Sequence, residues 1–337
     1  MDYQKPLIGF KIIINSINRS FTISNIRLGV IGAGYIAKEH LKVIKAIDGV
    51  CALGITSRSI SKAEELAKNF FIESVYEDID DLINNSSIDG LMICVSANQM
   101  FEITKKVIPS KIPLFIEKPP GLTPDQTKIL VKLCKKFDTK NMVGYNRRYY
   151  SIFHEGIKII NQNGGLLGLA IEGHERFWKI AGKKITNEIQ ENWIYANSTH
   201  TIDLLRFFGG EIKNISHITK SLKEKNGDHF VASMEFESGA LGTYSSHWYS
   251  PGGWAVTLYG DSITVKFNPL ENGIWIDTDM NEHEIYPDIV DVKYKPGLYR
   301  QMESFVELVK KNHLKSPGVE IRQALRTMLL AEKFSNG

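Results

Sequence analysis

Residues 26–37 read IRLGVIGAGYIA, an apolar run that leads into the turn Gly32-Ala33-Gly34-Tyr35-Ile36-Ala37. In a strand–turn–helix unit of this spacing, Gly32 allows the tight turn and Gly34 lets the backbone approach a pyrophosphate. The N-terminus of the following helix offers N–H groups and its positive dipole end to the phosphates. The alternative is a glycine turn that only packs a helix on a strand. We predict a dinucleotide-binding unit whose cofactor contacts include Gly32, Gly34, Tyr35 and Ile36.

From this turn to about Tyr145, short apolar runs alternate with helical stretches. The runs lack polar–apolar alternation, so we expect strands that are buried on both faces of a parallel sheet. They are Ile26–Ile31, Cys51–Thr56, Leu91–Val95, Leu114–Ile116 and Met142–Tyr145. Helices between consecutive strands imply right-handed crossovers and a doubly wound sheet.

Two helix starts in this half carry capping signals. Ser61-Lys62-Ala63-Glu64 has the spacing of a capping box and predicts a helix through about Phe70. Thr123-Pro124-Asp125-Gln126 supplies a cap, a proline at the first helical position and a capping glutamine.

After Arg148 the pattern changes to strands that follow one another directly. Phe230–Phe236 and Ala240–Tyr244 flank Glu237-Ser238-Gly239, which predicts a β-hairpin. Other strand-like runs are Leu167–Glu172, Ala255–Tyr259 and Gly273–Ile276, and the helical stretches are His200–Phe208, Leu298–Lys310 and about Gln323–Lys333. We expect an α/β chain, with a doubly wound Rossmann sheet and an α+β domain that contains a large, open, mainly antiparallel sheet.

The length of 337 residues exceeds what one core usually holds, so we expect two domains. Residues 1–24 are predicted to be an N-terminal extension and residues 25–146 the dinucleotide-binding domain. Residues 147–337 are predicted to form a substrate and oligomerisation domain, whose last helices are placed to pack back on the first domain.

The composition excludes several classes of protein. A net charge of +3 without a basic stripe argues against a nucleic-acid partner. No apolar run approaches the roughly 18–20 residues of a membrane span, and the start of the chain lacks a secretory signal, so a cytoplasmic protein is expected. Cys51, Cys94 and Cys134 lack C-x-x-C spacing, so neither a disulfide framework nor a zinc site is expected. His174-Glu175 has no further ligand at regular spacing and is interpreted as a solvated strand edge rather than a metal site.

In a dinucleotide-binding domain, residues at the end of the second strand contact the adenosine ribose and decide between NAD and NADP. This end reads Ile55-Thr56-Ser57-Arg58-Ser59, without the acidic residue that holds the 2′-hydroxyl group of NAD. Ser57 and Arg58 can instead bind a 2′-phosphate, which favours NADP over NAD. If Arg58 only stacks on the adenine, the choice between NADP and NAD stays open.

Glu117-Lys118-Pro119 directly follows the run that ends at Ile116. The carboxyl ends of parallel strands line the ligand crevice of a doubly wound sheet. A lysine there is suited to proton transfer, because burial and neighbouring cations lower its pKa. Pro119 is positioned to fix the backbone, and a cis peptide bond is one way to do so.

Taken together, these segments resemble the Gfo/Idh/MocA oxidoreductases, the group of glucose–fructose oxidoreductase and inositol dehydrogenase. The resemblance extends from about Ile26 to Phe334 and rests on the glycine turn, Glu117-Lys118-Pro119, Tyr145-Asn146-Arg147-Arg148-Tyr149 and His200-Thr201-Ile202-Asp203. It implies an NAD(P)-dependent oxidoreductase that transfers a hydride between nicotinamide and a secondary alcohol or ketone of a carbohydrate. It also implies a homo-dimer or homo-tetramer that pairs through the sheet of the second domain.

The resemblance assigns catalytic roles to Lys118 and His200. In the family, the lysine hydrogen-bonds the reacting hydroxyl group and the nicotinamide ribose, and the histidine helps to move the proton. His200 opens a predicted helix, whose dipole disfavours the imidazolium and leaves a neutral imidazole to accept a proton. Further cofactor contacts are expected from Ser96, Ala97, Asn98, Glu117 and Lys118. Substrate contacts are expected from Lys118, Tyr145, Arg148, Trp193, Tyr195, Asn197 and His200.

The chain departs from the family pattern four residues before His200, where Ala196 replaces the usual aspartate. Asn197 can hydrogen-bond a hydroxyl group but cannot take a proton, so Lys118 is expected to carry more of the acid–base work. The stretch from Trp193 to His200 resembles a branch of surface-polysaccharide and nucleotide-sugar enzymes, which indicates a sugar or nucleotide-sugar substrate.

Three assignments stay open between two roles. Trp193 and Tyr195 either stack on a pyranose or belong to the core, and Arg148 either holds substrate or forms an interdomain ion pair. For the whole chain, the competing functions are an NAD(P)-binding regulator without catalysis and a glycosidase that uses a tightly held NAD.

Overall fold

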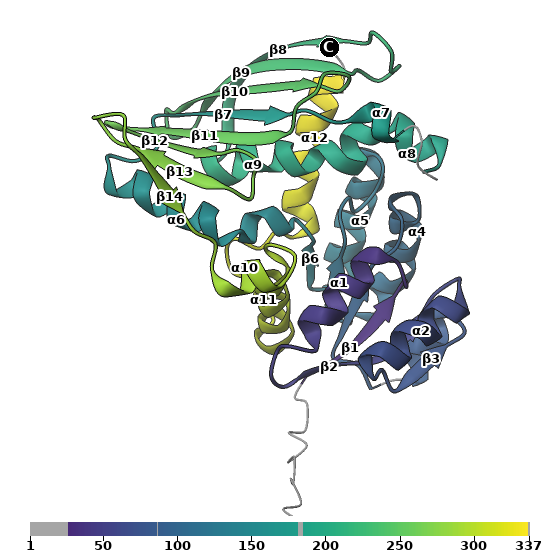
Figure 1. Cartoon of the computed structure of the whole chain (residues 1–337). Helices are drawn as coiled ribbons and strands as arrows, with labels where there is room; N and C mark the ends of the chain where they lie inside the picture. Colours follow the sequence, from purple (N-terminus) through teal and green to yellow (C-terminus); the bar gives the residue numbers. More distant parts are fainter. Residues whose placement is uncertain (1–25, 86, 181–184, 336–337) are drawn as a thin grey trace, which may run out of the picture.

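The computed structural model describes residues 26–335 apart from Ser86 and residues 181–184. Within these residues the chain forms two sheets, each with its own helices (Figure 1). The predicted extension over residues 1–24 lies outside the described residues. None of the described helices is both long enough and apolar enough to cross a membrane.

The first sheet has six described strands in the order β3-β2-β1-β4-β5-β6, and their pairings are parallel. The strands are β1 (Ile26–Ile31), β2 (Val50–Thr56), β3 (Ser74–Tyr76), β4 (Gly90–Ile93), β5 (Leu114–Ile116) and β6 (Asn141–Val143). The helices are α1 (Tyr35–Ile44), α2 (Ile60–Phe70), α3 (Ile79–Asn85), α4 (Ala97–Val107), η1 (Ile108–Ser110) and α5 (Pro124–Phe137). The prediction of a doubly wound sheet is confirmed. The strand order reverses at β1, so the ligand crevice is expected beside the ends of β1 and β4.

The predicted helix starts have different outcomes. The start of α5 is confirmed, because the Thr123 hydroxyl oxygen accepts the N–H of Gln126 at 3.2 Å and Pro124 is the first helical residue. The capping box at Ser61 is wrong, because α2 already begins at Ile60 and the carbonyl of Ser59 accepts the first N–H groups. Ser61 therefore lies inside the first turn, where it cannot act as the cap.

The second sheet has eight described strands in the order β14-β13-β12-β11-β7-β10-β9-β8. They are β7 (Gly168–Gly173), β8 (Ile212–Lys220), β9 (His229–Phe236), β10 (Leu241–His247), β11 (Trp254–Gly260), β12 (Ile263–Phe267), β13 (Gly273–Ile276) and β14 (Glu282–Ile285). β7 and β10 pair in parallel, and the other described pairs are antiparallel. The predicted hairpin is β9–β10, so a mainly antiparallel sheet is confirmed.

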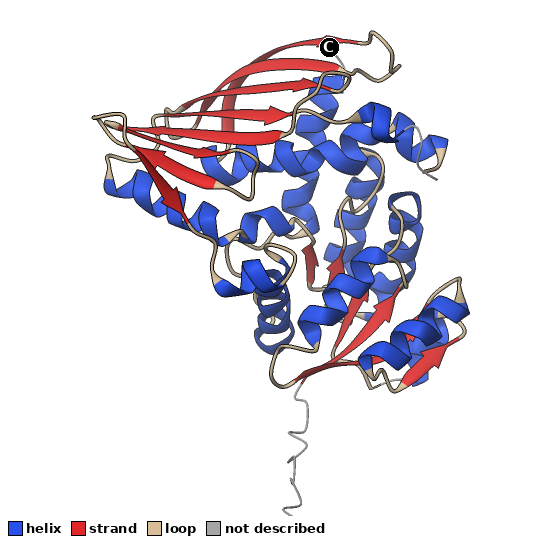
Figure 2. Cartoon of the chain, viewed as in Figure 1, coloured by secondary structure: helices blue, strands red, loops and turns tan. Residues whose placement is uncertain are grey.

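The helices of this half gather beneath one face of the large sheet, apart from the one before last, which packs against α1 and β1 of the first half (Figures 1 and 2). They are η2 (Asn146–Tyr149), α6 (Ser151–Gln162), α7 (Phe177–Ile180), α8 (Asn187–Glu191), η3 (Ile194–Ser198), α9 (Thr199–Gly209), α10 (Ile289–Lys293), α11 (Leu298–Lys311) and α12 (Ile321–Ser335). Helix α11 contacts α1, and α12 contacts both α5 and α9. The last two helices therefore join the two halves. The predicted boundary between residues 146 and 147 stays a prediction.

Candidate active site

The glycine turn after β1 has the geometry of a phosphate cradle. Gly32 has φ +108°, and a Cβ atom there would lie 2.3 Å from the carbonyl oxygen of Cys94, so only glycine fits. At Gly34, by contrast, a Cβ atom would meet no described atom within 4 Å. The space beside Gly34 opens at the N-terminus of α1, whose first N–H groups have no partner within the helix. The residues present therefore fit the pyrophosphate of a dinucleotide.

A groove of about 570 Å³ continues from this turn, lined by Gly32, Gly34, Ser57, Arg58, Ser96 and Lys62. Asn98 lies in the first turn of α4, where its side-chain oxygen accepts the hydroxyl group of Ser96 at 2.8 Å. The groove runs from the ends of β1 and β4 to the start of α2. Five of the eleven predicted cofactor residues line it, namely Gly32, Gly34, Ser57, Arg58 and Ser96, whereas Ala97, Asn98 and Lys118 are not among its lining residues.

Two other predicted cofactor residues have different surroundings. Ile36 packs against the apolar core of the first half. Tyr35 is 69% exposed, and the ammonium of Lys295 lies 5.3 Å from the centre of its ring. Lys295, just before α11, was not predicted from the sequence.

Lys118 follows β5 at the carboxyl edge of the sheet, and its peptide bond to Pro119 is cis. Its Nζ donates a hydrogen bond of 2.8 Å to the carbonyl of Ala196. Burial and the nearby charge of Arg147 lower the pKa of Lys118 to about 8. The side chain is therefore poised to hold or release a proton near neutral pH.

Glu117 does not line the cofactor groove among the described residues, although the sequence predicts a cofactor contact. Its Oε1 lies 2.7 Å from Nε2 of His40 on α1, in the interior. Its Oε2 accepts the backbone N–H of Lys118 at 3.2 Å. Glu117 thus ties the backbone of Lys118 to α1, a partnership that the sequence did not reveal.

His200 lies near the start of α9 and is buried. Arg147 Nη1 lies 2.8 Å from His200 Nε2, and because a guanidinium can only donate, Nε2 is the acceptor. Burial, Arg147 and Lys118 lower the pKa of His200 well below its usual value. The imidazole is therefore neutral, as the sequence predicted.

Aromatic rings surround this pair. The Arg147 guanidinium lies 4.7 Å from the ring centre of Trp254, and the His200 ring is 5.8 Å from Trp254 and 6.2 Å from Tyr145. Arg147 belongs to the segment Tyr145–Tyr149, on which the family resemblance partly rests, and Trp254 is the first residue of β11. Neither residue was predicted from the sequence to belong to the site.

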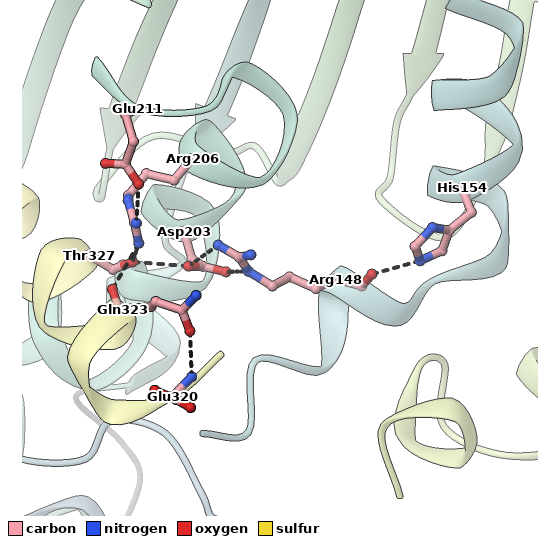
Figure 3. Close-up of polar contacts among 8 residues, drawn as sticks. All are labelled: Arg148, His154, Asp203, Arg206, Glu211, Glu320, Gln323 and Thr327. Carbon is pink, nitrogen blue, oxygen red and sulfur yellow. Dashed lines mark hydrogen bonds and ion pairs between the residues drawn. The ribbon is translucent and has the colours of Figure 1, made fainter. Parts of the chain in front are cut away.

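Arg148, the neighbour of Arg147, is engaged elsewhere. Its Nε and Nη2 donate to the two carboxylate oxygens of Asp203 at 2.6 and 2.9 Å. Thr327 on α12 donates to the same carboxylate at 2.9 Å (Figure 3). Arg148 therefore forms an ion pair, as one of its two alternatives had it, but the pair lies within the predicted second domain and not between the domains. These contacts fasten α9 to α12 beneath the site.

A second cleft, of about 500 Å³, is lined by Glu175, Arg176, Trp193, Asn197, Trp254 and Glu271. Trp193 and Asn197, two of the predicted substrate residues, line it, and Trp193 also packs against the core of the second half, so both of its alternatives stay open. Tyr195 does not line this cleft: it belongs to the core of the second half, and its hydroxyl lies 3.3 Å from that of Ser335 on α12. The core alternative therefore fits Tyr195.

The interpretation of Glu175 as part of a solvated edge is wrong. Glu175 is 4% exposed, and its carboxylate accepts the Asn197 amide at 2.8 Å and the Ser198 hydroxyl at 2.9 Å. Burial raises the pKa of Glu175. The described residues contain no group of three or more His, Cys, Asp or Glu side chains arranged to hold a metal ion.

Two family models match this chain. One, described as an oxidoreductase family with an NAD-binding Rossmann fold, matches residues 26–145, and the GFO/IDH/MocA C-terminal domain matches residues 170–266. The chain belongs to the GFO/IDH/MocA oxidoreductases. The family resemblance indicated by the sequence is confirmed.

Relatives within the family are distant. Myo-inositol 2-dehydrogenase of Thermotoga maritima is 26% identical over 64% of this chain and 66% of its own length, just under two thirds. The scyllo-inositol 2-dehydrogenase (NAD+) of Bacillus subtilis is 23% identical over 85% of this chain and 86% of its own. The structure of UDP-N-acetylglucosamine 3-dehydrogenase from Acidithiobacillus ferrooxidans has a TM-score of 0.72 at 16% identity, covering 92% of this chain and 97% of that one. At such identity the structural match shows the shared fold alone.

Proposed function

We propose that this chain transfers a hydride between a nicotinamide cofactor and a secondary alcohol or ketone of a sugar or nucleotide sugar. The observation that carries the proposal is that Lys118, with a pKa of about 8, lies near enough to the neutral His200 for its charge to lower the pKa of that imidazole. Both lie where the first sheet meets the second half of the chain. A protein that only binds the cofactor has no need for such a pair.

Lys118 handles the proton in this proposal. In the oxidation of an alcohol, its neutral amine accepts the hydroxyl proton, and in the reduction of a ketone its ammonium donates one. Arg147 donates to Nε2 of the neutral His200, so the ring proton lies on Nδ1, which is buried without a partner among the described residues and can donate a hydrogen bond to a substrate oxygen. The nicotinamide, when bound, supplies the hydride chemistry.

The second cleft supports a carbohydrate as the substrate. Trp193 and Trp254 offer aromatic surface for a pyranose ring, and the side chains of Asn197 and Arg176 offer polar contacts for hydroxyl or charged groups. Relatives named for inositol and for UDP-N-acetylglucosamine agree with this class.

A panel of sugars, inositols and nucleotide sugars, followed by nicotinamide absorbance with NAD and NADP, tests the proposal. We expect at least one of them to change the absorbance. Cofactor binding without turnover across the panel would favour a regulator. Release of sugar without a net absorbance change would favour a glycosidase.

NADP is the preferred cofactor in this proposal, because Arg58 and Lys62 both line the groove beside Ser57. Glu77 and Asp78 line the same groove, but the Asp78 carboxylate accepts the N–H of Asp81 in α3. Arg58 and Lys62 are groups in this groove that can bind a 2′-phosphate. The family description names NAD binding in general and leaves this preference open.

Replacing Arg58 by alanine tests the preference. A lost charge-assisted hydrogen bond is worth about 1.5–3 kcal/mol, so NADP affinity should fall about 10-fold or more. NAD affinity should change little. Calorimetric titration with both cofactors measures the two affinities, and Arg322→Ala, an exposed arginine on α12, controls for the loss of charge. Equal effects on both cofactors would contradict the preference.

We also propose a homo-dimer or homo-tetramer that pairs through the large sheet. Its outer face carries Ile218, Val231, Leu241 and Tyr259, which are exposed in the single chain. An apolar face of this kind is typical of a protein–protein contact. Sedimentation as a monomer at micromolar concentration would contradict this part of the proposal.

A further inference from the structure

The Lys118 ammonium lies among other cations. Arg147 and Lys295 both lower its pKa. Lys118 in turn lowers the pKa of His200 on α9. A buried ammonium that is surrounded in this way requires nearby negative charge to persist. The carboxylates that act on it are those of Glu117 and Glu175.

These two carboxylates are not equivalent. The Glu117 side chain is 2.7 Å from His40 Nε2 and lies on the α1 side. Glu175 follows β7 in the second half and lines the second cleft, and its negative charge raises the pKa of Lys118. Glu175 also acts on Tyr244 of β10, whose phenol is buried and protonated.

Three consecutive residues link Glu175 to Lys118. The Ala196 carbonyl accepts the Lys118 ammonium at 2.8 Å, and the side chains of Asn197 and Ser198 donate to Glu175 at 2.8 and 2.9 Å. All three residues belong to the π-helical turn η3. The orientation of this turn decides where the Ala196 carbonyl points, and Glu175 holds the turn by two side chains.

We propose that Glu175 is a positioning residue of the Lys118 centre, which holds turn η3 so that Ala196 receives the ammonium and which supplies the negative charge facing it. The proposal rests on the proposed function of Lys118. Because Ala196 has no side-chain acid, this charge comes from the segment that follows β7, 21 residues earlier in the chain. Glu175 touches neither the reacting atoms nor the cofactor in this role.

The Glu175→Gln variant tests the charge. Glutamine has the same shape and retains a carbonyl oxygen for hydrogen bonding, but it removes the negative charge facing Lys118. The ammonium then loses its partner, so the pKa of Lys118 should fall by about one unit. The pH profile of kcat/KM should move to lower pH by the same amount. A residue with a purely structural role would lower activity without this shift.

A second variant separates charge from geometry. Glu175→Asp keeps the charge but shortens the reach, so its pH profile should stay close to that of the parent while kcat falls. Glu172→Gln, three residues earlier on β7 and with a half-exposed side chain, is the matched control and should leave the profile unchanged. Thermal unfolding of each variant shows whether it folds.

Competitive acylation of the protein over a range of pH, read by mass spectrometry at Lys118, gives the same pKa without a substrate. Lys295 provides an internal comparison. A fall in the Lys118 pKa in Glu175→Gln but not in Glu175→Asp supports the proposal. An unchanged Lys118 pKa in Glu175→Gln, or an equal fall in both variants, overturns it. If the acylation results hold but Lys118→Ala turns over normally, the proposed function fails instead.

Discussion

We expect Lys118→Ala to lower kcat/KM by about 10²–10⁴-fold, the usual contribution of a positioned acid–base group. Lys118 is the group in the site whose pKa, about 8, lets it both accept and donate a proton near neutral pH. Steady-state kinetics with any substrate found in the panel measure the loss. Cofactor affinity should fall much less than kcat/KM, because the variant removes at most the contact of Lys118 with the nicotinamide ribose and leaves the phosphate cradle at Gly34 in place.

The pH dependence of the parent protein gives the same test without a mutation. Oxidation needs the neutral amine, so its rate should rise as the pH rises through about 8. Reduction needs the ammonium, so its rate should fall over the same range. Lys132→Ala, an exposed lysine on α5, serves as the control for Lys118→Ala. Normal turnover by Lys118→Ala, or rates that do not change near this pH, would contradict the mechanism.

The apolar pattern predicted the strands that are buried on both faces, and β1 and β5 have the predicted bounds. It missed strands at the edges of the sheets. β3 has three half-buried residues, and β14 reads Glu-His-Glu-Ile, so neither presents an apolar run. In β8 the pairing register shifts between Ile212 and Asn214, which breaks the alternation at its start.

The sequence predicted Lys118 and His200 because each lies in a short motif with a readable position. It could not tell Arg147 from Arg148, because two adjacent arginines look alike in sequence. The turn η2 separates them: Arg147 meets His200, 53 residues away, and Arg148 meets Asp203. Such contacts depend on how η2 packs against α9, which no local pattern encodes.

The burial of Glu175 is a second feature that the sequence did not predict. The charged stretch around it is typical of a solvated edge, and its neighbour Arg176 does lie at the surface. What buries Glu175 is turn η3, which brings Asn197 and Ser198 against it from 22 and 23 residues away. Because its carboxylate is satisfied by these donors, burial is tolerated.

We expect Asp203→Asn to lower the free energy of unfolding by about 3–5 kcal/mol, because it leaves the Arg148 guanidinium buried without its counter-charge. The Asp203 side chain is 1% exposed and Arg148 is 13% exposed. The substituted amide also points a donor at groups that are donors already, among them the Thr327 hydroxyl. A protein of ordinary stability, about 5–15 kcal/mol, would lose a large share of it.

Urea unfolding measures this effect, and the exposed pair of Asp125 and Lys128 on α5 supplies the control. Asp125→Asn should cost at most about 0.5 kcal/mol, as surface pairs do. Replacing both partners, with Arg148→Met and Asp203→Leu, should recover much of the loss, because no charge is then left unpaired. If Asp203→Asn instead raised KM and left stability unchanged, Arg148 would belong to the substrate site and the ion pair would not be its main role.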